Sequence, residues 1–221
     1  MTMKTLFFVH PDIPRECILE TVDVGADGFC GFRSLAANIK GNQDLFWEVK
    51  WDMLQCFYKN RDIYSKYFAT MFDLERLERS VSFGLEAIDS GRKVSFCPPE
   101  YWFSTPQCAQ LAVDTYRVPT VVYPCNVTLL SNGNFIEPPL LYLPFEGPKD
   151  EKKKIPQPLV LQHVGGCHWG TVKIIRKLKL EWANRRWRSN YGMYENGTKT
   201  KPQKEYTEGI VYKKKLKTIE D

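Results

Sequence analysis

The run DGFCGFR, residues 27–33, decides the interpretation of this chain, because it joins a tight turn to a helix with a cysteine at the junction. Asp-Gly is a turn signal, and the apolar residues after the turn recur at spacings of three and four as far as Ile39. Gly41 follows and is typical of a helix end. The sequence therefore predicts a helix that begins near Cys30.

A strand before this run and several helices after it are predicted from the side-chain pattern. Residues 18–24 alternate between apolar and polar side chains, which is typical of a short strand that leads into the turn. The predicted helical regions are a helix over about 43–58 capped by Asn42, broken pieces over 61–89, and a helix from Thr105-Pro106 to Arg117.

From Pro119 onward the pattern is typical of β-structure. Asn132-Gly133 predicts a hairpin, and Gly165-Gly166 separates two apolar runs that we expect to pair as antiparallel strands. The predicted strands are 120–123, 127–130, 134–136, 140–143, 159–164 and 168–175. Residues 149–154 are predicted to form a charged surface loop.

The length and composition are sufficient for one folded domain with a tail. The chain has 221 residues, of which 43% are hydrophobic and 14% aromatic. We expect an N-terminal segment over 1–17, a domain over 18–175 and a basic extension over 176–221. The extension holds 13 Lys and Arg against 6 Asp and Glu, a net charge of +7, whereas residues 1–175 hold 18 against 20, a net charge of −2.

The sequence also predicts the cellular location of the protein and the redox state of its thiols. No run of eighteen apolar residues is present, and the apolar residues before His10 are too few for a signal sequence, so neither membrane insertion nor secretion is predicted. The seven cysteines are odd in number and widely spaced, which argues against a disulfide framework. We expect a cytoplasmic or nuclear protein with reduced thiols. His163, Cys167 and His168 form the only close Cys/His group, so a metal is weakly supported, and no cofactor is expected.

Cys30 is the candidate nucleophile. A helix N-terminus favours the thiolate, because its free N–H groups and its dipole attract negative charge. The turn before Cys30 allows successive backbone N–H groups, those of Gly28 and Phe29 among them, to converge as an oxyanion hole. The alternative is that Cys30 is a small buried hydrophobe, as most free cysteines are.

A cysteine hydrolase also needs an imidazole that takes up and returns protons, and the chain has three histidines. His10 lies near the N-terminus and is predicted to be exposed and inert. His163 lies within an apolar strand, on either face. His168 begins a strand after the Gly165-Gly166 turn, so a rigid element would hold it at a loop mouth, and it is the preferred base.

The group that orients this imidazole is left open by the sequence. On a strand, the residue two positions after His168 lies on the same face, but that residue is Gly170. Asp27, three residues before Cys30, is the nearest substitute. Its alternative role is that of a turn residue whose carboxylate accepts a bond from its own backbone.

Three blocks of the sequence resemble the ovarian tumour (OTU) family of cysteine proteases. The family's nucleophile lies in a D-G-x-C-x-x-R run that opens a helix, here residues 27–33. WFSTPQCAQLAVDTYRVPTVVY, 102–123, is similar to the family's intermediate segment, and PLVLQHVGGCHWGTV, 158–172, looks like its histidine block. The blocks stand in the family's order and cover roughly residues 18–175.

The resemblance implies an α+β protein of the OTU/papain-like fold, with a central, mostly antiparallel sheet flanked by helices. It implies cleavage of the isopeptide or peptide bond after the C-terminal Gly-Gly of ubiquitin or a ubiquitin-like modifier. Cys30 would attack that carbonyl, His168 would move the proton, and N–H groups around residues 27–30 would hold the oxyanion. Trp169 would wall the glycine channel, or else pack in the core.

Two positions depart from the family's pattern. Phe29 stands where the family usually has a small polar residue, which a backbone oxyanion hole tolerates. Gly170 stands where many members carry Asn or Asp. Some relatives supply an acidic residue from near the cysteine, which favours Asp27 here.

Other functions are compatible with parts of the sequence. A papain-like protease has a similar spacing, since 138 positions separate Cys30 from His168, but its CGSCW signature is absent. A non-catalytic OTU-like module that binds ubiquitin is an alternative suggested by Gly170. A third is weak nucleic-acid binding by the basic extension, where Trp182 and Trp187 lie among arginines; its lysine-rich end also matches a nuclear address.

Overall fold

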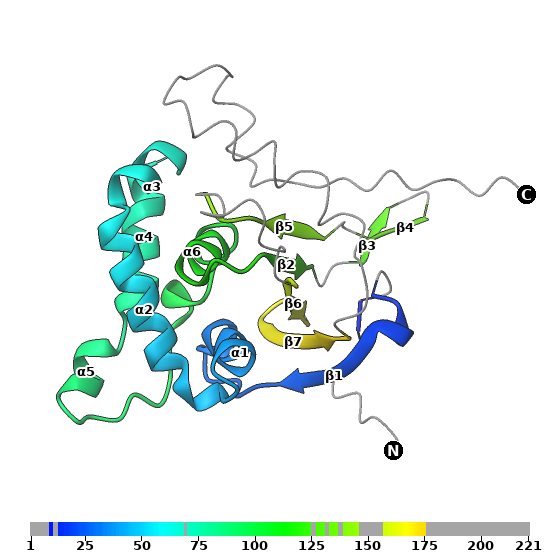
Figure 1. Cartoon of the computed structure of the whole chain (residues 1–221), viewed down its shortest axis with the longest axis horizontal. Coiled ribbons are helices and arrows are strands. Elements are labelled where there is room, and N and C mark those ends of the chain that lie inside the picture. Colours follow the sequence, from blue (N-terminus) through cyan, green and yellow to red (C-terminus); the bar gives the residue numbers. More distant parts are fainter. Residues whose placement is uncertain are drawn as a thin grey trace, which may run out of the picture.

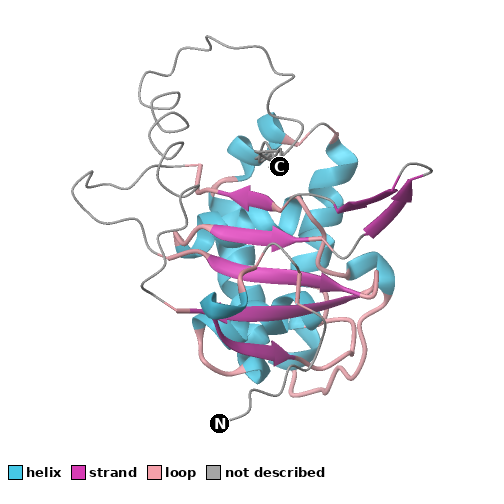
Figure 2. Ribbon diagram, turned by 90° about the vertical axis from the view of Figure 1, so that its right-hand side faces the viewer, coloured by secondary structure: helices cyan, strands magenta, loops and turns pink. Residues whose placement is uncertain are grey.

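The computed structural model describes residues 9–10, 13–68, 70–124, 127–130, 133–136, 139–145 and 157–175. A five-stranded sheet carries the helices mainly on one of its faces (Figure 1, Figure 2). The predicted charged loop at 149–154 and the extension over 176–221 lie outside the described residues, so the predictions made for them stay predictions.

The strands of the sheet are β1 Ile18–Asp23, β2 Thr120–Tyr123, β5 Leu140–Tyr142, β6 Leu159–Val164 and β7 His168–Ile174. Their order is β1-β7-β6-β2-β5. β2 and β6 are parallel, and the other neighbouring strands are antiparallel. The predicted α+β class with a mostly antiparallel sheet is thus confirmed. β1 lies beside β7, although these strands are far apart in the chain (Figure 1).

A separate two-stranded hairpin stands beside this sheet. β3 Val127–Leu130 pairs antiparallel with β4 Gly133–Ile136, and Leu130 lies opposite Gly133. The hairpin predicted from Asn132-Gly133 is confirmed by this pairing.

The helices follow the predicted pattern with shifted boundaries. The predicted helix over 43–58 opens with a 3-10 turn in which the Asn42 side chain accepts a bond from the backbone of Asp44, and Arg117, at φ 57°, ends the last helix. None of the helices in the described part of the chain has the length and apolar character that a bilayer-spanning helix needs. The α-helices are α1 Cys30–Ile39, α2 Phe46–Lys59, α3 Arg61–Tyr67, α4 Met71–Ser82, α5 Leu85–Asp89 and α6 Gln107–Tyr116, and the 3-10 helices are η1 Arg15–Cys17, η2 Gln43–Leu45 and η3 Pro99–Tyr101.

The main core lies between the helices and one face of the sheet. α1 contributes most of its residues to it, including Phe32 and Leu35, which are fully buried. Trp169 of β7 belongs to this core, whereas Val172 of the same strand belongs to a smaller cluster on the other face. α1 is therefore held between α2 and β7, and its first residue is fixed relative to the first residue of β7.

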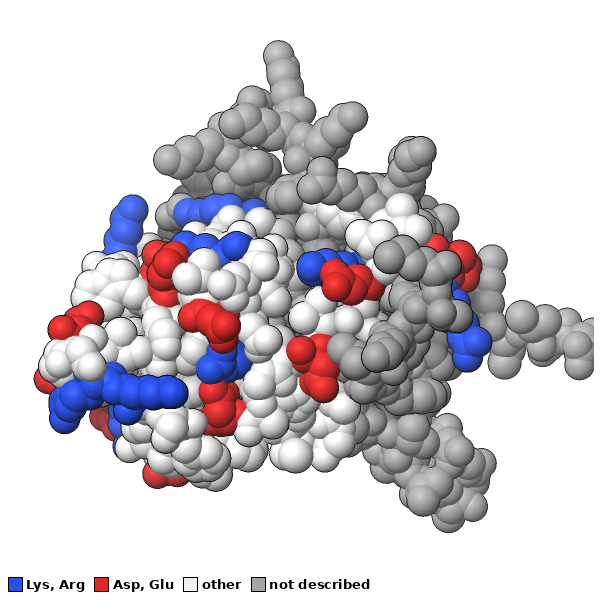
Figure 3. Space-filling model, turned by 90° about the horizontal axis from the view of Figure 1, so that it is seen from below, with Lys and Arg blue, Asp and Glu red and all other residues white. Residues whose placement is uncertain are grey.

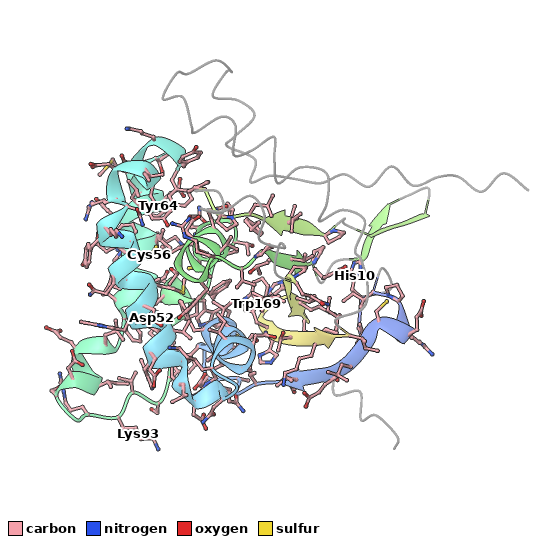
Figure 4. The ribbon with its side chains drawn as sticks, viewed as in Figure 1. His10, Asp52, Cys56, Tyr64, Lys93 and Trp169 are labelled. Carbon is pink, nitrogen blue, oxygen red and sulfur yellow. The ribbon has the colours of Figure 1, made fainter. Side chains whose placement is uncertain are left out.

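His10 is the clearest error among the sequence predictions. It was expected to be exposed, but it is 5% exposed. Its backbone N–H donates to Gln162 Oε1 at 3.0 Å, and its ring lies 5.0 Å from that of Tyr123. Figure 4 shows His10 beyond the sheet, on the side away from α1 and α2. The cause is tertiary, because Val9 and Ile13, on either side of His10 in the chain, pack on the second face of the sheet.

Candidate active site

Cys30 is the first residue of α1, and a glycine makes the preceding turn possible. Gly28 has φ +84°, and a side chain at this position would meet the carbonyl oxygen of Cys97. The N–H of Cys97 donates to the carbonyl of Asp27 at 2.8 Å, and Trp102 Nε1 donates to the carbonyl of Cys97 at 2.8 Å. The turn that carries the cysteine is thus packed against the loop before η3.

The Cys30 thiol is buried at the helix start, where backbone N–H groups surround it. Burial raises the pKa of Cys30, and the carboxylate of Asp27 adds to the rise. The backbone N–H groups of Trp169 and Gly31 hydrogen-bond the sulfur and oppose this rise in pKa. The bond from Trp169 brings the sulfur against the first peptide of β7, next to His168.

His168, the first residue of β7, is held by a carboxylate from the neighbouring strand. Its Nε2 lies 2.8 Å from Oδ1 of Asp23, the last residue of β1. Asp23 pairs with Gly170 across the two strands. The carboxylate therefore lies opposite position 170, where many OTU proteins carry an acidic or amide side chain. Asp23 was missed in the sequence, because only the register of β1 on β7 reveals it.

Asp27 is engaged elsewhere than predicted. It was expected to orient His168, but its carboxylate accepts bonds from the Arg33 guanidinium at 2.7 to 3.2 Å and from the backbone N–H of Phe29 at 3.1 Å. The bond from the N–H of Phe29 is the one that a turn-forming Asx residue makes, which was the alternative role predicted for Asp27. The imidazole partner that the structure contains is Asp23.

The backbone N–H groups of Gly28 and Phe29, the two predicted oxyanion donors, are not equally placed to bond an oxyanion. The N–H of Phe29 is directed to the carboxylate described above. Its side chain is fully buried, with ring centroids 4.9 Å from both Phe46 and Trp47, so the departure from the family's small polar residue anchors the turn in the core. Gly28 and Cys30 itself are then the candidate oxyanion donors.

The side chain of Trp169 lies in the core beneath the site. It is 7% exposed, and its ring lies 5.5 Å from Phe103 and 4.7 Å from His163. In Figure 4 it lies between α1 and the sheet. The side chain of Trp169 therefore packs in the core, which was the alternative to walling the channel, while its backbone N–H hydrogen-bonds the Cys30 sulfur.

His163 is half-buried behind His168. Burial lowers the pKa of His163, and the nearby His168 lowers it further, so this imidazole favours the neutral form.

Among the described residues, no three His, Cys, Asp or Glu side chains are grouped so that they could hold a metal ion. On the face seen in Figure 3, acidic and basic side chains are interspersed.

Comparisons with known proteins give structural matches only. No protein-family model matches the chain, and no curated protein matches it in sequence. The viral OTU domain protease from Farallon virus is 17% identical, with a TM-score of 0.43 over 72% of this chain and 85% of that one. The Qalyub virus OTU protease is 15% identical, with a TM-score of 0.47 over 73% and 87%. The Hazara virus OTU, solved bound to ubiquitin, is 15% identical, with a TM-score of 0.40 over 71% and 81%. These structures come from the family that the sequence blocks resemble.

Proposed function

We propose that the protein is a thiol hydrolase of the OTU type, which cleaves the isopeptide or peptide bond after the C-terminal Gly-Gly of ubiquitin or a ubiquitin-like modifier. One arrangement carries the proposal: Cys30, the first residue of α1, shares a core cluster with Trp169 of β7, and His168, directly before Trp169, is held by Asp23. The choice of modifier rests on the motif resemblance of residues 27–33 and 158–172.

The nitrogen that faces the nucleophile follows from the position of the carboxylate. Asp23 occupies Nε2 of His168, which leaves Nδ1 for the proton of the thiol. Because burial raises the pKa of Cys30, the sulfur keeps its proton near neutral pH until it attacks. Nδ1 then takes this proton as the Cys30 sulfur forms a bond to the scissile carbonyl carbon.

The same groups complete the reaction. The carbonyl oxygen becomes an oxyanion that the N–H groups of Gly28 and Cys30 stabilise. His168 returns the proton to the leaving amine, the bond to nitrogen breaks, and a thioester remains on Cys30. Water then gives a proton to His168 as its oxygen attacks the thioester carbon. The C–S bond breaks, His168 returns the proton to the Cys30 sulfur, and the modifier leaves as a carboxylic acid that ionises in water.

A ubiquitin that carries an electrophile at its C-terminus tests this proposal. We expect the native protein to form one covalent adduct and Cys30→Ala to form none. Cys167→Ala is the matched control, because Cys167 is an exposed thiol directly before His168, and this variant should react like the native protein. An adduct that depends on Cys167 would refute the assignment of the nucleophile.

The alternative of a non-catalytic binding module predicts a different result. Such a protein would bind intact ubiquitin in a titration and give no adduct with the electrophile. This outcome would contradict the hydrolase proposal.

A further inference from the structure

Asp27 and Arg33 form a two-point salt bridge beside the nucleophile, and the mechanism above does not use it. Arg33 lies one helical turn after Cys30, and its Nη2 and Nε lie 2.7 Å and 3.0 Å from Oδ2 of Asp27, with Nε also 3.2 Å from Oδ1. The two side chains are 15% and 24% exposed, so water screens the pair only in part. A planar guanidinium held in this way fixes orientation as well as charge.

Arg33 also ties the turn to the start of α2. Its Nη1 lies 2.8 Å from Oδ1 of Asp44, and its guanidinium carbon lies 4.1 Å above the ring of Phe46. On the other side of the turn, the N–H of Gly25 donates to Oε1 of Gln43 at 2.9 Å. The residues before Cys30 are thus attached to η2 and α2 at two places.

The Asp27 end of the pair holds the backbone of the turn itself. Its carboxylate accepts the N–H of Phe29 at 3.1 Å, and its carbonyl accepts the N–H of Cys97 at 2.8 Å. These bonds fix the peptides on both sides of Gly28. The direction of the N–H groups at Gly28 and Cys30 therefore depends on where Asp27 is held.

We propose that Asp27 and Arg33 are a positioning pair for the nucleophile: the salt bridge fixes the turn over residues 25–29 and balances the carboxylate charge beside the Cys30 thiol. The proposal rests on the proposed function for its effect on turnover. Its effect on the thiol does not depend on any substrate.

Removing one member of the pair should shift the pKa of the Cys30 thiol in a direction that can be measured. The Asp27 carboxylate raises the pKa of Cys30, and the Arg33 cation offsets this negative charge at close range. Among the described residues, Cys97, in the loop packed on the turn, also interacts electrostatically with Cys30, and His168 directly precedes Trp169, whose N–H bonds the sulfur. Removing Arg33 alone would leave the carboxylate uncompensated and make the thiolate harder to form.

The test is the pH profile of Cys30 alkylation by iodoacetamide, read by mass spectrometry of the Cys30 peptide. We expect Arg33→Gln to move the profile to higher pH and to slow alkylation near neutral pH by about threefold to tenfold. Asp27→Asn should move it to lower pH, and the double variant Asp27→Asn/Arg33→Gln should return to within about twofold of the native rate. The Asp27→Asn and double variants decide the question if Arg33→Gln does not fold.

Arg61→Gln is the matched control. Arg61 pairs with Glu78 at 3.1 Å and lies over the ring of Phe57, so it also combines a carboxylate with an aromatic ring, but on α3, away from Cys30 (Figure 1). Its alkylation profile should equal the native one. Identical profiles for Arg33→Gln and the native protein, or a double variant as displaced as Arg33→Gln, would overturn the charge balance.

Arg33→Lys separates geometry from charge. It keeps the cation but loses the two-point contact, so the alkylation profile should stay near native. With a ubiquitin-fluorophore substrate, kcat should fall about tenfold while KM stays within about twofold. An unchanged kcat would refute the positioning role. If the native protein lacks ubiquitin activity, the proposed function fails, and the alkylation profiles still decide on the charge balance.

Discussion

Oδ1 of Asp23 lies 2.8 Å from Nε2 of His168, although 145 positions separate the two residues in the chain. The contact crosses from β1 to β7, so the imidazole partner comes from the neighbouring strand instead of from position 170 of its own strand. An imidazole held at Nε2 has a defined tautomer and presents Nδ1. The five-stranded sheet is therefore part of the catalytic arrangement that we propose.

Asp23→Ala should lower kcat for a ubiquitin-fluorophore substrate by about 100-fold, because the imidazole loses the group that fixes its tautomer. Gly170 faces the same side of β7 as His168, so adding Gly170→Asp to Asp23→Ala should recover about tenfold of the loss. Glu20→Ala is the control, since Glu20 pairs with Lys173 at 2.9 Å across the same two strands. An equal loss in Glu20→Ala would mean that the strand pairing matters and the carboxylate does not.

Gly28→Ala should unfold more easily than the native protein and lose activity. The new methyl group would meet the carbonyl of Cys97, and φ +84° is strained for alanine. Gly41→Ala is the matched control, because Gly41 has φ +73° with no atom near a side chain placed there. Denaturant titrations should show about 1 kcal/mol of destabilisation for Gly41→Ala and at least about 2 kcal/mol for Gly28→Ala. Equal losses would show that the contact with Cys97 is unimportant.

Lys50→Met should stabilise the protein near neutral pH. Lys50 is fully buried, its Nζ bonds the carbonyl of Ser80 at 2.5 Å and lies 4.1 Å above the ring of Phe32, and burial lowers its pKa to about 8. Because the unfolded chain holds this proton more tightly, the charged lysine destabilises the folded state below pH 8, and the penalty fades as pH rises toward 10.5.

Denaturant titration of Lys50→Met at two pH values measures this effect. We expect a gain in unfolding free energy of roughly 2 kcal/mol at pH 7, after loss of the bond to Ser80, and a smaller gain at pH 10. Lys66→Met, on an exposed position of α3, should change little at either pH. A Lys50→Met protein that is less stable at pH 7 would show that the bond and the ring contact outweigh the burial of charge.

Removal of residues 176–221 tests the predicted boundary and the predicted basic extension together. A chain that ends at Ile175 should keep the native unfolding temperature within a few degrees and keep its reactivity with the ubiquitin probe. If residues 176–221 bind polynucleotide, the untruncated chain should bind it more weakly as the salt concentration rises. The chain that ends at Ile175 should then not bind it. Unfolding of the shortened chain would move the domain boundary beyond 175.

Local patterns in the sequence were sufficient to predict the elements that carry Cys30 and His168. The turn-to-helix junction at Cys30, the end of α6 at Arg117 and the strand that begins at His168 each depend on residues close by. Glycine, asparagine and alternating apolar residues report such features directly.

Long-range contacts could not be predicted in this way. Asp23 is an ordinary strand-end residue until the register with β7 brings it to His168. The burial of His10 depends on Gln162 and Tyr123, which lie far along the chain. Asp27 had two roles open to it, the distant contact with His168 and the local turn, and the choice between them depends on Arg33, whose position follows only when the helix is built.

The pairing of β1 with β7 has a consequence for how activity arises during synthesis. The helix with Cys30 emerges from the ribosome some 138 residues before His168. A nascent chain that already contains Cys30 therefore has neither His168, the proposed base, nor the strand that holds it against Asp23. In the folded protein, fraying of the edge strand β1 would release the imidazole without disturbing the thiol, so the proposed turnover would be an early reporter of local unfolding at that edge.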